Sequence, residues 1–277
     1  MREKEEYIYS STELSRYYGI SVKGMEFYEQ KNLVHPERIG PGKTRRYNLP
    51  DCYQFATARM LRNCGFCIED TAALLADSRP EYVRNRFTAR ADQLEEEIRL
   101  QEGVVRGIRR KTEGIESIQK GDIGPRVQRH PGFFRLFIRR FAGRHTSTEE
   151  ESGQLSHWNR LMPITEASLR IPKEDLLGAG EIMDTEVGMI ITQEDFFRYH
   201  LDRTDRVSFI PPGRAVYGIA SGPETELDRK EALEPLLALI RQREYVVSGD
   251  GFSRLIHVMD DERAQRKRYD EVWIPIE

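Results

Sequence analysis

The chain has 277 residues, enough for two domains that each bury a core, and a formal net charge of −3. Its three cysteines are too few and too clustered for a disulfide framework. The N-terminus lacks the apolar stretch of a signal peptide, and no apolar run approaches the ~20 residues of a membrane span, so we expect a cytoplasmic protein without a membrane partner.

Charge is distributed unevenly along the chain. Between Tyr7 and Tyr47 there are seven Lys and Arg residues and four Asp and Glu residues, whereas residues 122–277 contain 22 and 27. A mildly basic head before an acidic tail favours an anionic partner for the head alone.

The sequence of the head, residues 7–78, predicts short helices joined by turns. Capping residues at 10–12 precede a helix over 13–18 that ends at Gly19, and a second helix follows over 22–30. Two short helices joined by a turn with glycine form a helix-turn-helix, whose second helix enters the major groove. The Pro- and Gly-rich turn before Arg45-Arg46-Tyr47 is typical of a wing that contacts phosphates. Two more helices are predicted, from Asn48 to near Gly65 and over 68–75.

Residues 82–119 predict one long helix with an apolar seam. The spacing of four and three is that of a coiled coil, and charges of both signs lie between the seam positions. These positions are Phe87, Ala91, Leu94, Ile98, Gln101, Val105, Ile108, Thr112 and Ile115. One helix cannot bury such a seam, so we infer a homodimer, most simply an antiparallel pair. The alternative is that the helix packs on the core of its own chain.

Three glycines interrupt this helix. Gly103, Gly107 and Gly114 each cost roughly 1 kcal/mol relative to Ala, so the helix is not stable through propensity alone.

The order of motifs resembles the MerR family of transcription regulators. The family's "LRYYE" helix, "RRY" wing and "GF" turn correspond to residues 25–29, 45–47 and 65–66, and the long helix follows. The resemblance covers residues 7 to about 119. It implies a homodimer that binds double-stranded promoter DNA with RNA polymerase. The implied DNA contacts come from Thr12, Arg16, Lys23, Tyr28, Lys43, Arg45, Arg46, Tyr47 and Arg62.

The second helix departs from the family at Glu26, where the family usually has Arg, and at the preceding Gly24. A carboxylate is repelled by phosphates, and glycine weakens the helix. Glu26 can accept a hydrogen bond from cytosine N4, or it can turn away and pair with Arg16 or Lys23. We expect this departure to affect the affinity for DNA and the choice of operator sequence more than the fold of the head.

Cys64 and Cys67 have the spacing of a redox pair or half a zinc site. The second half of a zinc site is missing, and the pair lies on a turn where the family needs a glycine with apolar neighbours. We therefore favour simple packing of the two thiols and expect no metal and no cofactor.

After a Gly/Pro linker over 120–125, strands and helices alternate. Strands are predicted over 126–130, 133–139, 186–192, 214–220, 252–259 and 269–276, and helices over 148–161 and 225–243, the first capped by Thr148 and the second burying Leu227. Pro235 is predicted to kink the second helix.

The layout of residues 212–277, with its terminal Glu-Val-Trp-Ile-Pro-Ile run, resembles the GyrI-like effector-binding domain, and the resemblance covers roughly residues 122–277. This implies a pseudo-twofold α+β sandwich with a central pocket, and an α+β fold class for the chain. The predicted domains are a winged helix-turn-helix over 1–80, a dimerisation helix over 81–120 and the effector domain over 121–277.

In the last strand, Tyr269, Glu271 and Trp273 share one face. A carboxylate between two aromatic rings suits an apolar cation as a small-molecule effector. The predicted ligand-binding residues are Phe133, Phe137, Trp158, Tyr199, Tyr217, Tyr269, Glu271 and Trp273. The alternative is that Glu271 is solvated on the outer face of the sheet and that the rings are core.

Enzyme motifs are missing: there is no H-E-x-x-H, no P-loop and no G-x-S-x-G. We interpret the chain as a ligand-responsive regulator that distorts a pseudo-palindromic promoter. The alternative is a small-molecule-binding or hydrolysing GyrI-like protein with weakened DNA binding, in which Glu271 acts as a general base.

Overall fold

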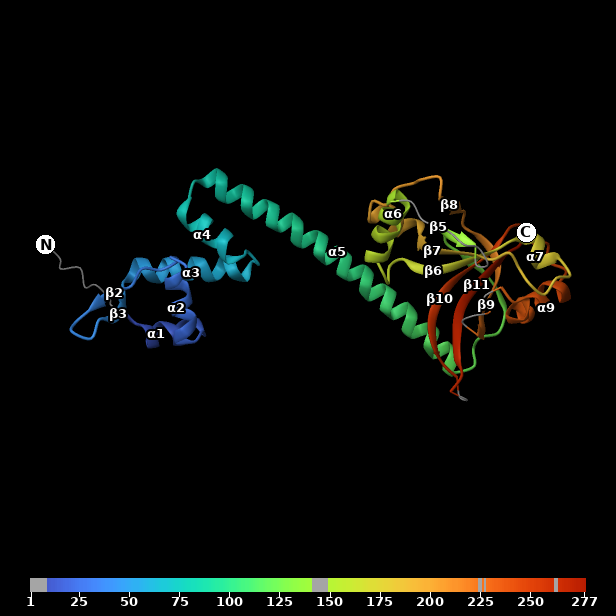
Figure 1. The fold of residues 1–277 in the computed structure, drawn as a ribbon, viewed down its shortest axis with the longest axis horizontal. Coiled ribbons are helices and arrows are strands. Elements are labelled where there is room, and N and C mark those ends of the chain that lie inside the picture. The colour runs from blue at the N-terminus through green and yellow to red at the C-terminus, as the bar shows by residue number, and fades with distance from the viewer. Residues whose placement is uncertain (1–8, 141–148, 224–225, 227, 262–263) are drawn as a thin grey trace. The chain divides into compact units, whose positions relative to one another are not determined.

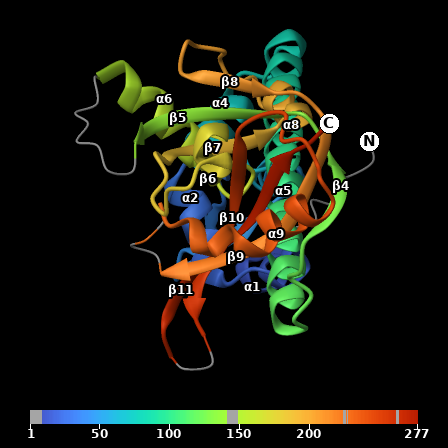
Figure 2. The same cartoon turned by 90° about the vertical axis from the view of Figure 1, so that its right-hand side faces the viewer.

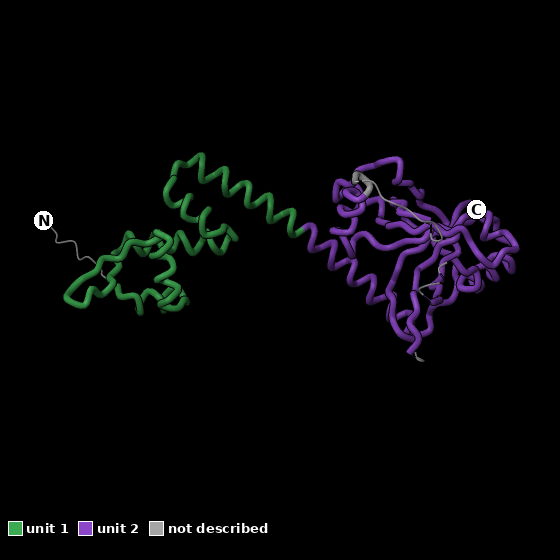
Figure 3. The backbone as a smooth tube through the Cα atoms, viewed as in Figure 1, with its two compact units in different colours: residues 1–98 green, residues 99–277 purple. Residues whose placement is uncertain are grey.

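The computed structural model describes residues 9–140, 149–223, 226, 228–261 and 264–277. The chain forms two compact units, residues 1–98 and residues 99–277, shown in different colours in Figure 3. The boundary lies inside one long helix, α5 (Pro80–Gln119), which confirms the helix predicted over 82–119. Each unit is described by itself below.

The first unit contains four short helices and a small sheet with strand order β1-β3-β2 (Figure 1). The helices are α1 (Ser11–Tyr18), α2 (Val22–Gln30), α3 (Leu49–Asn63) and α4 (Ile68–Ala76). The strands are β1 (Tyr9–Ser10), β2 (Glu37–Ile39) and β3 (Thr44–Tyr47). All four predicted helices are present, and β2 with β3 forms the predicted wing.

Capping side chains fix where these helices begin and end. The Ser10 hydroxyl accepts from the Glu13 backbone N–H at 3.3 Å, and the Glu13 carboxylate accepts from the Ser10 N–H in return. Gly19 ends α1 in the left-handed conformation, with φ of 62°. Gly65 has φ of 88° and lies against Arg90 of α5, so any Cβ there would meet the Arg90 guanidinium.

The second unit is built on an eight-stranded antiparallel sheet with strand order β4-β9-β11-β10-β6-β7-β5-β8 (Figures 1 and 2). Its strands are β4 (Arg126–His130), β5 (Phe133–Arg140), β6 (Glu166–Ile171), β7 (Glu186–Thr192), β8 (Val207–Ile210), β9 (Gly213–Pro223), β10 (Gly251–Asp260) and β11 (Arg266–Pro275). Its helices are α6 (Glu149–Arg160), α7 (Lys173–Leu177), α8 (Gln193–Arg198) and α9 (Glu234–Gln242), with a 3₁₀ turn over Lys230–Leu233.

The sheet consists of two similar halves. One half runs β5, α6, β6, β7 and the other runs β9, α9, β10, β11, and in each the order from the centre of the sheet outward is second strand, third strand, first strand. The antiparallel pair of β6 and β10 joins the halves at the centre. This arrangement confirms the predicted pseudo-twofold α+β fold.

One predicted helix of the second unit differs from the structure, and two strands and the short helices α7 and α8 were not predicted. The helix predicted over 225–243 begins only at Glu234, because Pro235 lies in the first turn, where its missing N–H costs nothing, and so starts the helix and does not kink it. Strands β6 and β8 were not predicted. The predicted cap Thr148 and the predicted core residue Leu227 lie outside the described residues.

The sheet has two distinct faces. The helix face carries Leu136, Met189 and Val272 and packs on α6, α8 and α9. The opposite face, here called the aromatic face, carries Phe133, Tyr217, Phe252 and Trp273, which strand register places on one side.

From Arg99 onward, α5 packs against its own chain through its glycines. A Cβ at Gly107 would lie 2.6 Å from the Pro163 carbonyl oxygen, and one at Gly103 would overlap the Tyr199 hydroxyl. The glycines that weaken the helix therefore allow its close approach to the domain. This packing is the alternative that the sequence left open.

Only part of the predicted seam lies on the other side of the helix, because Phe87 packs with Phe66 and Ile115 packs with Ile256 in cores of its own chain. Ile98, Val105 and Ile108 are 56%, 43% and 54% exposed in the single chain. One side of α5 is thus covered by its own domain, while the middle of the seam, from Ile98 to Ile108, keeps an apolar surface open to solvent.

Candidate functional sites on the aromatic face and the head

The aromatic face has a buried cluster of rings at its centre. Trp273 lies 5.4 Å from Phe252 in a stacked arrangement, 5.7 Å from Phe133 and 5.3 Å from Tyr217, measured between ring centroids. The strand pairs Phe252–Trp273 and Trp273–Tyr217 bring these side chains together from three strands. Three of the predicted ligand-binding residues therefore meet in one cluster.

Glu271 lies beside this cluster, and the chain itself neutralises its charge. Its carboxylate accepts from the Tyr217 hydroxyl at 2.9 Å and pairs with the Arg254 guanidinium at 2.6 Å. Arg254 also lies over the Trp273 ring, 5.3 Å from its centroid. Burial, together with the neighbouring Glu271 charge, raises the pKa of Tyr217. Arg254 thus occupies the position predicted for a cationic ligand.

A second carboxylate on this face anchors α5. Glu166 is only 4% exposed and pairs with Arg110 at 2.9 Å, Lys111 at 3.0 Å and Arg254 at 3.4 Å. Arg254 therefore bridges Glu166 and Glu271, so ion pairs run without interruption from the ring cluster to α5. Sequence reasoning missed Glu166 and Arg254, because neither lies in a recognisable motif.

A large cavity, with a volume of about 890 Å³, opens on the aromatic face next to the ring cluster. Its apolar wall includes Phe137, Phe209 and Phe252. Its charged wall holds more cations than anions: Arg135, Arg140, Arg170, Arg206 and Arg214 against Glu186, Asp205 and Asp250. Both the size and the mixture of apolar and polar groups suit a small organic molecule.

Arg135 is the most buried charged residue of this cavity, with 2% of its surface exposed. Burial lowers the pKa of its guanidinium to about 10, which leaves it charged at neutral pH. Glu186 is its carboxylate neighbour at 3.6 Å, and that carboxylate also pairs with Arg170 at 2.8 Å.

The other predicted ligand-binding residues are scattered. Phe137 lines the cavity, whereas Tyr269 packs with Ile219 and Ile256 near the end of α5. Trp158 and Tyr199 belong to the core of the helix face, so the sheet separates them from Trp273. Their place as pocket walls beside Glu271 is not supported, because an aromatic residue on a helix or loop carries no sequence signal for which face it will cover.

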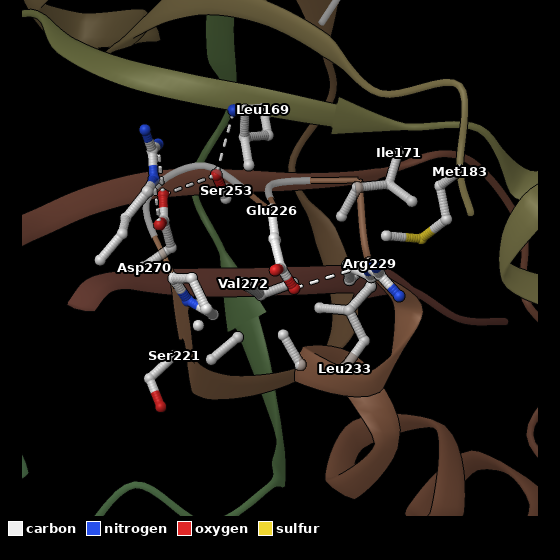
Figure 4. Close-up of a pocket in the computed structure, with 15 residues that line it drawn as sticks. Leu169, Ile171, Met183, Ser221, Glu226, Arg229, Leu233, Ser253, Asp270 and Val272 are labelled. Atoms are coloured by element: carbon white, nitrogen blue, oxygen red, sulfur yellow. Dashed lines mark hydrogen bonds and ion pairs between the residues drawn. The ribbon is translucent and has the colours of Figure 1, made fainter. Parts of the chain in front are cut away.

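Figure 4 shows a smaller cavity on the helix face, with Leu169, Ile171, Val272 and Leu233 on its wall. Its volume of about 40 Å³ holds no more than about three water molecules. It is too small for an effector.

In the head, α2 presents an exposed surface above a buried one. Met25 and Tyr28 anchor the helix in the core, while Lys23 and Phe27 are exposed, Phe27 by 44%. Phe27 was not predicted as a contact, although an exposed aromatic residue on a helix that enters the groove can pack on a thymine methyl group.

The carboxylates of α2 pair with the wing. Arg45 lies 2.6 Å from Glu29 and 3.0 Å from Glu26, and Arg38 lies 2.6 Å from Glu29. Glu26 thus pairs with Arg45, and not with the Arg16 or Lys23 considered from the sequence. These bonds fix the wing against α2 and reduce the positive charge that the wing offers to phosphates.

Residues 9–78 match the model of the MerR HTH family regulatory protein. The head is a MerR-type DNA-binding domain. A chain with this domain is a DNA-binding regulator.

Beyond the MerR-type head, similarity to known proteins is distant. No curated protein matches the chain in sequence. The cryo-EM structure of an EcmrR–DNA complex is 16% identical, covers 97% of this chain and 99% of that one, and has a TM-score of 0.37. A MerR family regulator from Bacillus cereus is 17% identical over 39% of this chain and 83% of that one, with a TM-score of 0.36. The structure of SAV2435 bound to tetraphenylphosphonium is 15% identical over 55% of this chain and 93% of that one, with a TM-score of 0.28. With TM-scores this low, none of these likenesses supports an inference about this chain.

Within the MerR-type head, burial separates the predicted DNA contacts into two groups. The exposed or partly exposed ones are Thr12, Arg16, Lys23, Lys43, Arg45, Arg46 and Arg62. Tyr28 and Tyr47, by contrast, are 7% and 1% exposed and pack in the core with Phe55. Their burial does not support direct contact with DNA. In this head the two rings pack in the core and hold α2 and β3 against it.

The two clustered cysteines of the MerR-type head are free thiols that end or begin helices. Cys67 caps α4, with its sulfur accepting from the Asp70 N–H at 3.3 Å, and Cys64 follows the end of α3. Nowhere in the described ranges do three or more His, Cys, Asp or Glu side chains gather to hold a metal. Among those same residues, no helix combines the length and apolarity needed to cross a bilayer.

Proposed function

We propose that this protein is a ligand-responsive transcription regulator that binds promoter DNA as a homodimer. A small molecule in the cavity of the second unit would change the distortion that two MerR-type heads impose on a pseudo-palindromic site. RNA polymerase at that promoter would be the downstream partner. The observation that carries the proposal is a MerR-type head joined by one uninterrupted helix to a domain with a cavity of about 890 Å³.

The seam of α5 supports the homodimer. Ile98, Val105 and Ile108 have the spacing of coiled-coil positions and are about half exposed, and their burial against a second copy would remove apolar surface from water. Two heads related by twofold symmetry would match two half-sites, as symmetric regulators do.

The ion pairs at α5 support a ligand response. Lys111 donates to the Leu255 and Ile256 carbonyls at 3.0 and 3.1 Å in addition to pairing with Glu166, so α5 is bonded directly to β10. The other end of β10 contributes Phe252 to the cavity. A ligand that binds two arrangements of this strand differently would shift the balance between them, and α5 would follow.

The test combines oligomeric state with DNA binding. Light scattering should report two copies for the full chain, and fluorescence anisotropy should show salt-dependent binding to DNA from the promoter of its own gene. The variant Ile108→Glu should lower the mass to one copy and weaken DNA binding, whereas Glu113→Gln, on an exposed position of the same helix, should do neither. A single copy at micromolar concentration with no DNA binding would reject the proposal.

A further inference from the structure

We propose that the cavity on the aromatic face binds an organic anion, with a carboxylate directed at Arg135 and an aromatic body against Phe137 and Phe252. This inference rests on the proposed function and specifies the class of effector. This ligand differs from the cation that the sequence suggested, because the side chains around the cavity carry more positive than negative charges.

Arg135 has fewer partners than a buried guanidinium needs. One terminal nitrogen donates to the Glu186 carbonyl at 2.8 Å, and the other lies 3.6 Å from the Glu186 carboxylate, too far for a good hydrogen bond. Within the described part of the chain, its buried Nε–H has no acceptor. A buried donor without an acceptor is costly, so this position favours a ligand that supplies an oxygen.

Trp273 is a second donor of the same kind. Its indole Nε1–H is also buried without an acceptor among the described residues. Trp273 stacks on Phe252, which lines the cavity. The buried side-chain groups without a partner on this face, among the described residues, include Arg135 Nε and Trp273 Nε1, which are both donors, and an anion supplies acceptors.

A cationic ligand would compete with the chain's own side chains. Arg254 already holds the Glu271 carboxylate and the face of Trp273, and it would have to leave both, and Glu166 as well, before a ligand cation could take its place. A second cation would also meet the excess of arginines around the cavity.

The experiment uses the full-length protein and matched probes. Primary carboxylates, amides and methylammonium compounds on phenyl, naphthyl and biphenyl frames differ in charge but share their apolar body. Binding is followed by tryptophan fluorescence and by the midpoint of thermal unfolding. We expect the carboxylate of at least one frame to bind about tenfold or more tightly than its amide, with the ammonium compound weakest.

The variant Arg135→Met should abolish this preference, leaving the carboxylate no tighter than the amide, while Arg241→Gln, an exposed arginine on α9, should keep it. If Arg135→Met does not fold, Arg170→Gln should still reduce the preference by several-fold. Tighter binding of the ammonium compounds would overturn the anion while leaving an effector cavity in place. A carboxylate preference that survives in Arg135→Met would overturn the role of Arg135. If none of the three classes binds at millimolar concentration, both the anionic ligand and the role of the cavity as a binding site would be rejected.

Discussion

Replacing Glu166 by Gln should loosen α5 from the sheet of the second unit. The carboxylate is 4% exposed and faces three cations, at 2.9, 3.0 and 3.4 Å. Glutamine keeps the shape and one carbonyl acceptor but removes the negative charge. Arg110 and Lys111 would then be left without a carboxylate on this face, whereas Arg254 keeps Glu271.

The size of the effect follows from burial. Removal of one partner of a fully buried ion pair costs about 3–5 kcal/mol. Arg110 and Lys111 are 24% and 30% exposed, so water offsets part of the loss. We therefore expect a loss of about 3 kcal/mol, at the lower end of this range. With an m-value of about 2 kcal/mol/M, the urea midpoint should fall by ~1.5 M.

Tryptophan fluorescence is the suitable assay, because both tryptophans, Trp158 and Trp273, lie in the second unit. The matched control is Glu194→Gln, since Glu194 is 76% exposed and pairs only with a surface arginine, Arg198, among the described residues. This control should shift the midpoint by less than ~0.5 M. Equal midpoints for the Glu166 variant and the wild type would refute the role assigned to the Glu166 ion pairs.

Three further predictions follow from other sites. Gly107→Ala should destabilise the second unit by about 1–3 kcal/mol, because the new methyl group meets backbone, whereas Gly153→Ala in α6, where space is open, should stabilise it by up to about 1 kcal/mol. Glu26→Gln should raise DNA affinity roughly threefold, since it removes a charge near phosphates and frees Arg45 from one partner, a change of about 0.5–1 kcal/mol. Burial lowers the pKa of His130, so the folded state binds its proton less readily than the unfolded state, and stability should fall as the pH drops below about 6.5, by up to about 1.4 kcal/mol per pH unit.

Each of these has its own measurement. Urea unfolding compares the two glycine variants, and a stabilising Gly107→Ala would contradict the close packing of α5. Anisotropy titrations compare Glu26→Gln with Glu113→Gln, which should leave affinity unchanged; a weaker Glu26 variant would mean that this carboxylate reads a base. For His130, urea midpoints between pH 7 and pH 5.5 should fall more steeply in the wild type than in His130→Asn, and parallel slopes would show that the ring is not responsible.

The sequence predicts the head well because its signals are local. Ser10 with Glu13, and Asn48 with Asp51, are capping pairs three residues apart that place the helix starts directly. The register of β11 was also predictable, since strict alternation separates Glu271 and Trp273 from Val272 on the opposite face.

Features that depend on long-range pairing could not be predicted. Strand β6 was missed because Glu166, Ser168 and Arg170 look like solvent-facing positions, whereas Glu166 and Ser168 are buried in this fold. Arg254 becomes the partner of Glu271 only through the pairing of β10 with β11. The cation that the sequence assigned to a ligand is therefore already supplied from a neighbouring strand.

The opposite placement of glycines and seam residues on α5 has a consequence for signalling. Rotation of this helix about its own axis would move Gly107 away from Pro163. The same rotation would change the direction in which Ile108 faces. Ligand binding in the cavity and contact between the two subunits would then both depend on one variable, the rotation angle of α5 about its axis.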